Sequence, residues 1–487
     1  MNKGILLILD GYGEGKADKY NAVQNAKTPF LHSLKNNSYS LIKTDGEAVG
    51  LFEGEMGGSE VGHTTIGAGR VVLSTAKKIS TQIKQHKFEK IKTFKTMLNN
   101  LKQNNADLHL FGLMSDKNIH SDINHMFRII EISKDYAKNI FIHFITDGRD
   151  CGQFDSLKYL KQVQNVIKNT PNCSILSVSG RFYAMDRENY MERTNLAFNA
   201  MFKGENEIAS PEKYIRQQHK DGHNDQYVLP AHVKNKNFKQ IQKNDYILFF
   251  NFREDRLRQI VRKCGELKCN LVSMADVANT KAVALYPSKF IEHTLSEYLS
   301  SLGLKQIKIS ETTKYAHVTY FLNGGQEKPF KNEDRVHVPT IETNDYALTP
   351  HMQAEEITKE LLKAMKKNYD AIIVNYSNSD MLGHTGNYKA TVEALECLDE
   401  CVKKVVANAK KYGYFVLITA DHGNSEQMRT ESGQPHTSHT LNKVICTVQN
   451  ANVKMKKQGG LKDIAPTFID LMEIEKYPYF KGKSLIV

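Results

Sequence analysis

Residues 4–13, GILLILDGYG, place five consecutive apolar residues directly before an aspartate and a glycine-rich turn. A short apolar run that ends in this way is typical of a buried strand in a parallel sheet. Open α/β sheets bind their ligands outside the carboxyl ends of such strands. The stretch therefore predicts a buried strand with Asp10 at its tip, either as a metal ligand or as a turn cap.

Six more stretches have the same form and predict further strands. They are residues 107–116 (DLHLFGLMSD), 140–150 (IFIHFITDGRD), 173–181 (CSILSVSGR), 245–253 (DYILFFNFR), 370–380 (DAIIVNYSNSD) and 414–424 (YFVLITADHGN). Helical patterns lie between them; in residues 154–169 the apolar stripe comprises Phe154, Leu157, Leu160, Val163 and Ile167. Alternating strands and helices predict an α/β protein with mainly parallel sheets.

The length of 487 residues predicts two domains, because one hydrophobic core usually serves at most about 250–300 residues. The predicted strand ends differ in chemistry along the chain. Aspartates and histidines follow the strands near both termini, whereas ten of the 13 arginines lie between Arg128 and Arg262. We therefore expect one domain built from residues 1–74 and 289–487, interrupted by an inserted domain of residues 75–288.

The composition excludes several classes of protein. The 40% hydrophobic and 25% charged residues are typical of a globular chain, and the early apolar run is too short for a signal peptide or a membrane span, so we expect a cytoplasmic protein without a membrane partner. The seven cysteines form no CxxC pair, which argues against a disulfide scaffold or a zinc ribbon. A net charge of +12 suggests a nucleic-acid-binding protein, but the lysines are scattered and no nucleic-acid-binding module is recognisable, so we expect no such partner.

Aspartates and histidines recur at the strand ends near the termini. Asp380 and His384 are four residues apart, so both side chains point the same way on a helical turn. The remaining members are Asp10, Asp421 and His422, with His436 and His439 in PHTSHT. This mixture of oxygen and nitrogen donors suits two divalent cations such as Mn²⁺ or Zn²⁺. Two neighbouring cations are the usual device for displacement at phosphorus.

Residues 56–69, MGGSEVGHTTIGAG, contain Ser59 after two glycines, where a helix is expected to start. The stretch lacks the lysine of a Walker phosphate-binding loop. Ser59 is therefore either a helix cap or a nucleophile that a metal ion and the helix amino terminus activate. For His63, four residues later, a structural contact is favoured over a catalytic role, and both stay open.

Arginines follow three of the predicted strands in the middle of the chain. They occur in DGRD (residues 147–150), GRFYAMDR (180–187) and NFREDR (251–256). Guanidinium groups bind carboxylate and phosphate bidentately, so these turns could converge on a small polyanion; independent surface ion pairs are the alternative. His120 and Asp150 could add hydrogen bonds or proton transfer to hydroxyl groups.

In this order and spacing, the sequence resembles the cofactor-independent (2,3-bisphosphoglycerate-independent) phosphoglycerate mutases of the alkaline phosphatase superfamily. The matching segments span nearly the whole chain: LDGYG, GGSEVGHTTIGAGR, DGRD, GRFYAMDR, FNFREDR, ETTKYAHVTYFLNGG, SDMLGHTG, ADHGN and PHTSHT. The resemblance implies an alkaline-phosphatase-like metal domain with a second α/β domain, the glycerate-binding phosphotransferase domain, inserted into it. It also implies interconversion of 3-phosphoglycerate and 2-phosphoglycerate in glycolysis and gluconeogenesis, with two Mn²⁺ ions, a phosphoserine intermediate and a monomeric enzyme.

The resemblance carries over residue by residue. It implies that Asp380, His384 and His439 bind one metal ion, and that Asp10, Ser59, Asp421 and His422 bind the other. It makes Ser59 the phosphoryl acceptor and Lys314 the residue that steadies the phosphate charge. It assigns the glycerate to His120, Arg149, Asp150, Arg181, Arg187, Arg253 and Arg256, with Asp150 as the proton shuttle.

The family mechanism predicts that the inserted domain must close onto the metal domain for phosphoryl transfer. The runner-up function is a metal-dependent phosphomonoesterase, or a mutase for another phosphosugar, with the same metal set. The spacing of the three arginine segments favours phosphoglycerate.

Overall fold

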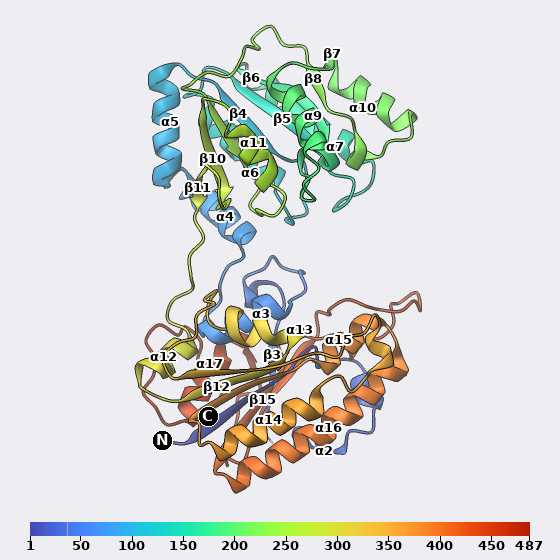
Figure 1. Ribbon diagram of the computed structural model, residues 1–487, viewed down its shortest axis with the longest axis vertical. Helices are drawn as coiled ribbons and strands as arrows, with labels where there is room; N and C mark the ends of the chain where they lie inside the picture. Colours follow the sequence, from blue (N-terminus) through green and yellow to red (C-terminus); the bar gives the residue numbers. More distant parts are fainter. Residues whose placement is uncertain (37) are drawn as a thin grey trace. The chain divides into compact units, whose positions relative to one another are not determined.

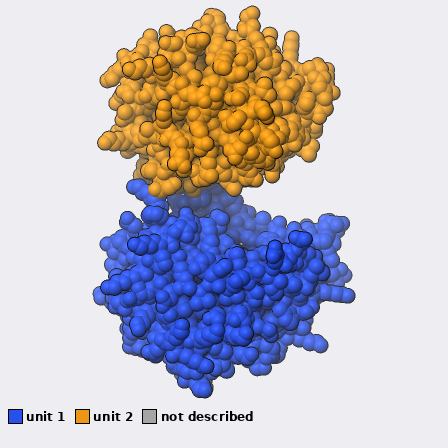
Figure 2. All heavy atoms as spheres, viewed as in Figure 1, with its two compact units in different colours: residues 1–74, 289–487 blue, residues 75–288 orange. Residues whose placement is uncertain are grey.

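The computed structural model describes residues 1–36 and 38–487, and the chain divides into two compact units (Figure 2). Unit 1 comprises Met1–Ser74 and Lys289–Val487, and unit 2 comprises Thr75–Ser288. Among the described residues, none of the helices combines the length and the apolar character that crossing a membrane requires.

Unit 1 is built on a nine-stranded sheet. Its strands run in the order β13 (Glu333–Val338), β12 (Gln306–Glu311), β14 (Ala371–Tyr376), β1 (Lys3–Leu9), β15 (Tyr414–Thr419), β16 (Lys443–Gln449), β3 (Tyr39–Lys43) and β17 (Gln458–Gly460), with β2 (Gly13–Glu14) paired to β16. β1 lies in the middle and is parallel to both β14 and β15, with Gly4 opposite Ala371 and Phe415. These three strands are almost wholly buried, which explains their continuous apolar sequences.

Helices cover both faces of this sheet (Figure 1). One face carries α1 (Ala22–Asn25), α2 (Pro29–Ser33), α14 (Ala354–Lys366) and the long α16 (Tyr388–Lys411), and the other carries α3 (Ser59–Ala68), α12 (Leu295–Ser301) and α17 (Ile464–Leu471). α13 (Thr312–Ala316) and α15 (Asn378–Thr385) are short helices that begin directly after β12 and β14. α16 begins where the Asn387 side chain accepts a hydrogen bond from the Ala390 backbone N–H, as a helix cap does.

Unit 2 contains an eight-stranded sheet. The order is β11 (Val283–Tyr286), β10 (Asn270–Ala275), β9 (Tyr246–Phe249), β4 (Leu108–Leu113), β5 (Ile140–Thr146), β6 (Cys173–Gly180), β8 (Ala231–Val233) and β7 (Glu207–Ile208). The β6–β8 pair is antiparallel and the other pairs are parallel. The helices are α4 (Thr75–Lys84), α5 (Lys92–Asn104), α6 (Ile123–Ser133), α7 (Ser156–Lys168), α8 (Arg181–Ala184), α9 (Met191–Phe202), α10 (Pro211–Lys220) and α11 (Arg258–Cys264).

All seven strands predicted from the sequence are present, and the prediction of an α/β protein with mainly parallel sheets is confirmed. One detail of the predicted helix between β5 and β6 is wrong. Phe154 lies before α7 and is 56% exposed, whereas Tyr159 is buried with Leu160 and Val163. The reason is that α7 starts at Ser156, so the residue two positions earlier is outside the helical stripe.

A row of polar side chains crosses the buried middle of the unit 2 sheet. The Nδ1 atom of His109 on β4 lies 3.1 Å from Nε2 of His143 on β5, whose Nδ1 lies 2.8 Å from the Ser177 hydroxyl on β6. Burial lowers the pKa of His109 to about 4 and holds the pKa of His143 well below its ordinary value. Both imidazoles are therefore neutral in the folded protein near neutral pH.

Candidate metal centre and arginine cluster

The carboxyl ends of three neighbouring strands of unit 1 bring together residues that are far apart in the chain. Asp10 follows β1, Asp380 lies in α15 after β14, and the pair Asp421–His422 follows β15. Because these strands are parallel neighbours, their polar ends lie at one edge of the sheet. Two groups of possible metal ligands result: Asp380, His384 and His439 form one, and Asp10, Asp421 and His422 form the other. Within each group the ligand atoms lie within 4.8 Å of one another.

The first group is centred on the Asp380 carboxylate. Its Oδ1 atom lies 3.2 Å from Nε2 of His384, one helical turn along α15, and 3.4 Å from Nε2 of His439. The other ring nitrogens, Nδ1 of His384 and Nδ1 of His439, each lie 2.8 Å from a backbone carbonyl oxygen, of Thr437 and Gly57 respectively. A carbonyl oxygen can only accept a hydrogen bond, so Nδ1 is the donor in both histidines, and Nε2 is the nitrogen that faces the Asp380 carboxylate and would bind a cation.

The second group is completely buried. Nε2 of His422 lies 3.5 Å from both Asp10 Oδ1 and Asp421 Oδ2. Burial, and then the neighbouring charge of Asp421, raise the pKa of Asp10. Asp421 Oδ2 is buried and has no hydrogen-bond partner among the described residues. Clustered buried carboxylates are unfavourable unless positive charge compensates them, so these residues fit a divalent cation.

Lys314 and Ser59 lie between the two groups. The ammonium of Lys314, on α13, is 2.7 Å from Asp10 Oδ1, 2.6 Å from Asp380 Oδ2 and 2.6 Å from the Ser59 hydroxyl. Burial by itself lowers the pKa of Lys314, but the carboxylates of Asp10 and Asp380 outweigh it, so the pKa is raised and the side chain stays charged. The Ser59 hydroxyl also lies 3.2 Å from Asp10 Oδ1 and 3.0 Å from His422 Nε2.

The prediction that a helix starts at Ser59 is confirmed, since Ser59 is the first residue of α3 after the cap residue Gly58. Free backbone N–H groups and the helix dipole favour an anion at this end. A cavity of about 590 Å³ opens onto Ser59, Lys314, Asp380, His384 and His439. A phosphate group can therefore reach the serine and the lysine together.

Glycines allow this close assembly. Gly11, directly after Asp10, has φ of +71°, and a Cβ atom there would lie 2.7 Å from the Cα atom of Asp380. Only glycine combines that backbone conformation with so close an approach. A Cβ atom at Gly62, on α3, would lie 2.9 Å from Cβ of Asp421. The glycines of both segments thus make room for the carboxylates.

A second polar cluster lies at the carboxyl ends of β4, β5, β6 and β9 in unit 2. The buried guanidinium of Arg181 donates hydrogen bonds from one nitrogen to Asp147 Oδ1 and Asp150 Oδ2, both at 2.6 Å. Nε2 of His120 lies 3.7 Å from Asp150 Oδ2. Burial, and then the positive charge of Arg181, lower the pKa of His120 to about 4. His120 is therefore neutral near neutral pH and available for hydrogen bonds.

Asp255 lies on the other side of His120, with its Oδ1 atom 3.7 Å from Nδ1 of that histidine. It pairs with Arg187 at 3.2 Å and with Arg253 at 3.2 Å. Burial, and then the charges of Arg181, Arg187 and Arg149, lower the pKa of Arg256. Crowded positive charge of this kind favours a bound anion.

The structure thus places the predicted residues in two sets. Unit 1 brings together Asp10, Ser59, Lys314, Asp380, His384, Asp421, His422 and His439, and unit 2 brings together His120, Arg149, Asp150, Arg181, Arg187, Arg253 and Arg256. The sequence analysis missed Asp255, which sits inside the NFREDR segment, and Asn375, a polar residue in the otherwise apolar sequence of β14. Asn375 could have been found from the sequence, because a polar residue within an apolar strand needs a buried polar partner.

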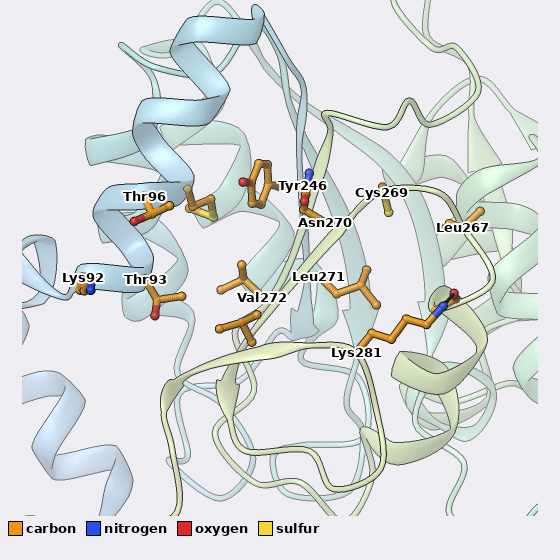
Figure 3. A pocket seen from close by; sticks show the side chains of 13 residues that line it. Lys92, Thr93, Thr96, Tyr246, Leu267, Cys269, Asn270, Leu271, Val272 and Lys281 are labelled. Carbon is orange, nitrogen blue, oxygen red and sulfur yellow. Dashed lines mark hydrogen bonds between the residues drawn. The ribbon is translucent and has the colours of Figure 1, made fainter.

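A further cavity in unit 2, of about 360 Å³, lies between α5 and the strands β9, β10 and β11 (Figure 3). Its lining includes Tyr246, the first residue of β9, and Asn270, the first residue of β10. It is therefore at the amino ends of these strands, opposite to the arginine turns, and none of the predicted site residues lines it. The candidate site for a small anion is the arginine cluster rather than this mostly apolar cavity.

The two sheets and the paired ligand groups define an α/β metalloenzyme, and residues 2–476 match the sequence model of the Metalloenzyme superfamily. The chain is 40% identical over 510 residues to 2,3-bisphosphoglycerate-independent phosphoglycerate mutase 2 of Methanosarcina acetivorans, covering 99% of this chain and 97% of that one. It therefore belongs to the 2,3-bisphosphoglycerate-independent phosphoglycerate mutases, which confirms the resemblance seen in its sequence. The mutase of Helicobacter pylori is also 40% identical, over 487 residues and 97% of both chains.

A solved structure supports the same assignment. A crystal structure of Leishmania mexicana phosphoglycerate mutase at low cobalt concentration superimposes with a TM-score of 0.67 and 30% sequence identity, covering 100% of this chain and 98% of that one. The similarity therefore extends over both units.

Proposed function

We propose that the protein interconverts 3-phosphoglycerate and 2-phosphoglycerate without 2,3-bisphosphoglycerate, through a phosphoserine at Ser59. The observation that carries this proposal is the position of the Ser59 hydroxyl in a chain that belongs to this family. The hydroxyl lies at the start of α3 and within 3.2 Å of Lys314, His422 and Asp10, between the two ligand groups.

Two divalent cations fit the ligand groups, and we propose Mn²⁺ for both. Asp380, His384 and His439 would hold one, and Asp10, Ser59, Asp421 and His422 the other. The mixed oxygen and nitrogen donors, the inward Nε2 atoms of His384 and His439 and the buried Asp421 carboxylate support this assignment. When bound, such cations lower the pKa of a serine hydroxyl and neutralise charge on phosphoryl oxygens.

In the first half-reaction, Ser59 Oγ loses its proton to solvent and bonds to phosphorus, while the bond from phosphorus to the glycerate oxygen of 3-phosphoglycerate breaks; Ser59 regains a proton when the phosphoryl group leaves it. Lys314 donates hydrogen bonds to the phosphoryl oxygens, because its ammonium lies 2.6 Å from the Ser59 hydroxyl. The free N–H groups at the start of α3 favour the same negative charge. Both residues keep this role in the second half-reaction, when the phosphoryl group leaves Ser59 for the other hydroxyl.

The arginine cluster of unit 2 holds the glycerate between the two steps. Arg187 and Arg253 are about half exposed and pair with Asp255. They can therefore bind the substrate carboxylate in place of the Asp255 carboxylate. Asp150 gives a proton to the first glycerate oxygen and takes one from the second. Arg181 keeps the Asp150 carboxylate in place at 2.6 Å, and the neutral His120 lies beside it.

The serine and the glycerate-binding residues belong to different units, so transfer requires the two units to close on a shared substrate. Closure would exclude water, which otherwise competes for the phosphoserine. Solution scattering tests this step: the radius of gyration should fall when 3-phosphoglycerate and Mn²⁺ are added, and an unchanged value contradicts closure. Each chain carries both residue sets, which supports a monomeric enzyme, and a role in glycolysis agrees with the cytoplasmic location expected from the sequence.

The activity is tested by incubating the enzyme with 3-phosphoglycerate and Mn²⁺ and following the products by phosphorus NMR. We expect 2-phosphoglycerate to form without added 2,3-bisphosphoglycerate. Inorganic phosphate as the main product would instead identify a phosphomonoesterase.

A further inference from the structure

The α3 helix places His63 one turn after Ser59, inside unit 1. His63 is completely buried, and its ring contacts the backbone of the serine and one carboxylate of the buried ligand group. Nδ1 lies 2.9 Å from the Ser59 carbonyl oxygen and 3.3 Å from Asp421 Oδ2. The histidine is therefore in contact with both the residue that accepts the phosphoryl group and a residue that would bind a cation.

The other ring nitrogen meets a side-chain amide. Nε2 of His63 lies 3.1 Å from Nδ2 of Asn375, the fifth residue of β14. The same Nδ2 donates a hydrogen bond of 2.7 Å to Asp10 Oδ2. The amide has two N–H groups, so it can donate one to the carboxylate and one to the imidazole. Reversing it would place its carbonyl oxygen against the Asp10 carboxylate, which electrostatic repulsion disfavours.

These partners assign the proton of His63. Nδ1 faces two acceptors and carries the hydrogen, while Nε2 faces a donor and is the acceptor. The contacts of both nitrogens therefore fit the tautomer that carries its hydrogen on Nδ1. In this arrangement the ring orients the Ser59 backbone and the Asn375 amide around the ligand group, as outer partners of metal ligands do.

Together the contacts form one chain of buried polar groups. It runs from the Ser59 carbonyl through His63 and Asn375 to Asp10, and Asp421 lies beside it. The residues that it touches, Asp10, Asp421 and Ser59, are all among those proposed to bind the second cation. In the described part of the chain, neither His63 nor Asn375 is hydrogen-bonded or ion-paired to Asp380, His384 or His439.

We propose that His63 and Asn375 are a positioning pair that holds Asp10, Asp421 and Ser59 in the geometry required by one of the two cations. The proposal rests on the proposed function, since it assigns a task to residues around that centre. It assigns His63, whose role the sequence left open, the task of positioning its neighbours.

The test is a titration of metal-free enzyme with Mn²⁺, followed by electron paramagnetic resonance, for the wild type, His63→Ala and Asn375→Ala. We expect each variant to lose roughly 10- to 100-fold in affinity at one of the two cation sites, with wild-type affinity at the other. His63→Asn should recover most of that loss, because its amide nitrogen can occupy the place of Nδ1 and donate to the Ser59 carbonyl. The double variant should be less than additive, because the two residues form one relay.

His32→Ala is the control. His32 is another histidine of unit 1 that contacts a backbone carbonyl, with Nε2 lying 3.1 Å from the Val23 oxygen, and it should bind both cations as the wild type does. Kinetics at saturating Mn²⁺ give a second readout: kcat should fall in His63→Ala, and KM for 3-phosphoglycerate should not change, because unit 2 holds the glycerate.

The possible outcomes distinguish a failure of the proposed mutase function from a failure of the positioning role. A wild-type enzyme that forms no 2-phosphoglycerate overturns the proposed function. An active wild type together with variants that bind both cations normally overturns the positioning role. Equal weakening of both cation sites, with no recovery in His63→Asn, shows a general structural role and overturns it as well.

Discussion

Replacing Lys314 by methionine removes a cationic side chain that touches both ligand groups. Its ammonium lies 2.6–2.7 Å from Asp10, Asp380 and Ser59, so the substitution removes the ammonium group that pairs with two buried carboxylates. Removing one member of a buried ion pair destabilises a protein by about 3–5 kcal/mol. We expect a loss of that size in the free energy of unfolding of the metal-free enzyme, and a smaller loss with saturating Mn²⁺, because bound cations compensate the same carboxylates.

Urea unfolding with EDTA and with Mn²⁺ measures both values. Lys308→Met is the matched control, since Lys308 is also buried in unit 1, 3.6 Å from Glu333 Oε1 and hydrogen-bonded to Asn323. Burial lowers the pKa of Lys308 to about 7, so it is only partly charged near neutral pH. The Lys308→Met loss should be the same with and without Mn²⁺. Equal losses with and without Mn²⁺ in Lys314→Met would refute the reasoning.

Three further predictions follow from the two units. Ser59→Ala should abolish mutase activity and retain most of the bound metal, because six other ligands remain; measurable turnover would contradict the nucleophile assignment. Arg187→Ala should raise KM for 3-phosphoglycerate about tenfold, with a smaller effect on kcat, if this half-exposed guanidinium binds the substrate carboxylate; steady-state kinetics decide this. The free energy of unfolding should fall as the pH drops from about 6.5 to about 4. In this range His109 and His143 bind protons in the unfolded chain but stay neutral in the folded protein, where burial lowers their pKa values. In His109→Gln, this loss in the free energy of unfolding, measured by urea unfolding at each pH, should be smaller by up to about 3 kcal/mol over that range. An unchanged loss would show that the histidine row does not cause the pH dependence.

The sequence predicted the strands and many of the candidate residues because both signals are local. An apolar run such as residues 5–9 predicts a buried strand whichever strands it pairs with, and the polar residue after it then lies at the end of that strand. The start of α3 at Ser59 and the helical turn that joins Asp380 to His384 are local in the same sense. Phe154 was misjudged since a periodic pattern does not mark the first residue of a helix.

Contacts between distant segments were not available from the sequence. Asn375 looks like an exception in an apolar strand until β14 lies beside β1 and its amide meets Asp10, 365 residues away in the chain. Asp255 is one of several charged residues in its turn, and its position between His120 and two arginines depends on the order of four strands.

The amino-acid sequence by itself therefore determined which segments form strands and helices, and which side chains stand at their ends. Only the tertiary structure decided which of those ends meet, because the placement of β1 between β14 and β15 is a property of the whole sheet. That placement brings the Lys314 ammonium within reach of carboxylates from both ligand groups, and it turns His63 from a residue of unknown task into a link between Ser59 and Asn375. Hydrogen bonds act over about 3 Å, so no pattern along the chain could specify those that join distant segments.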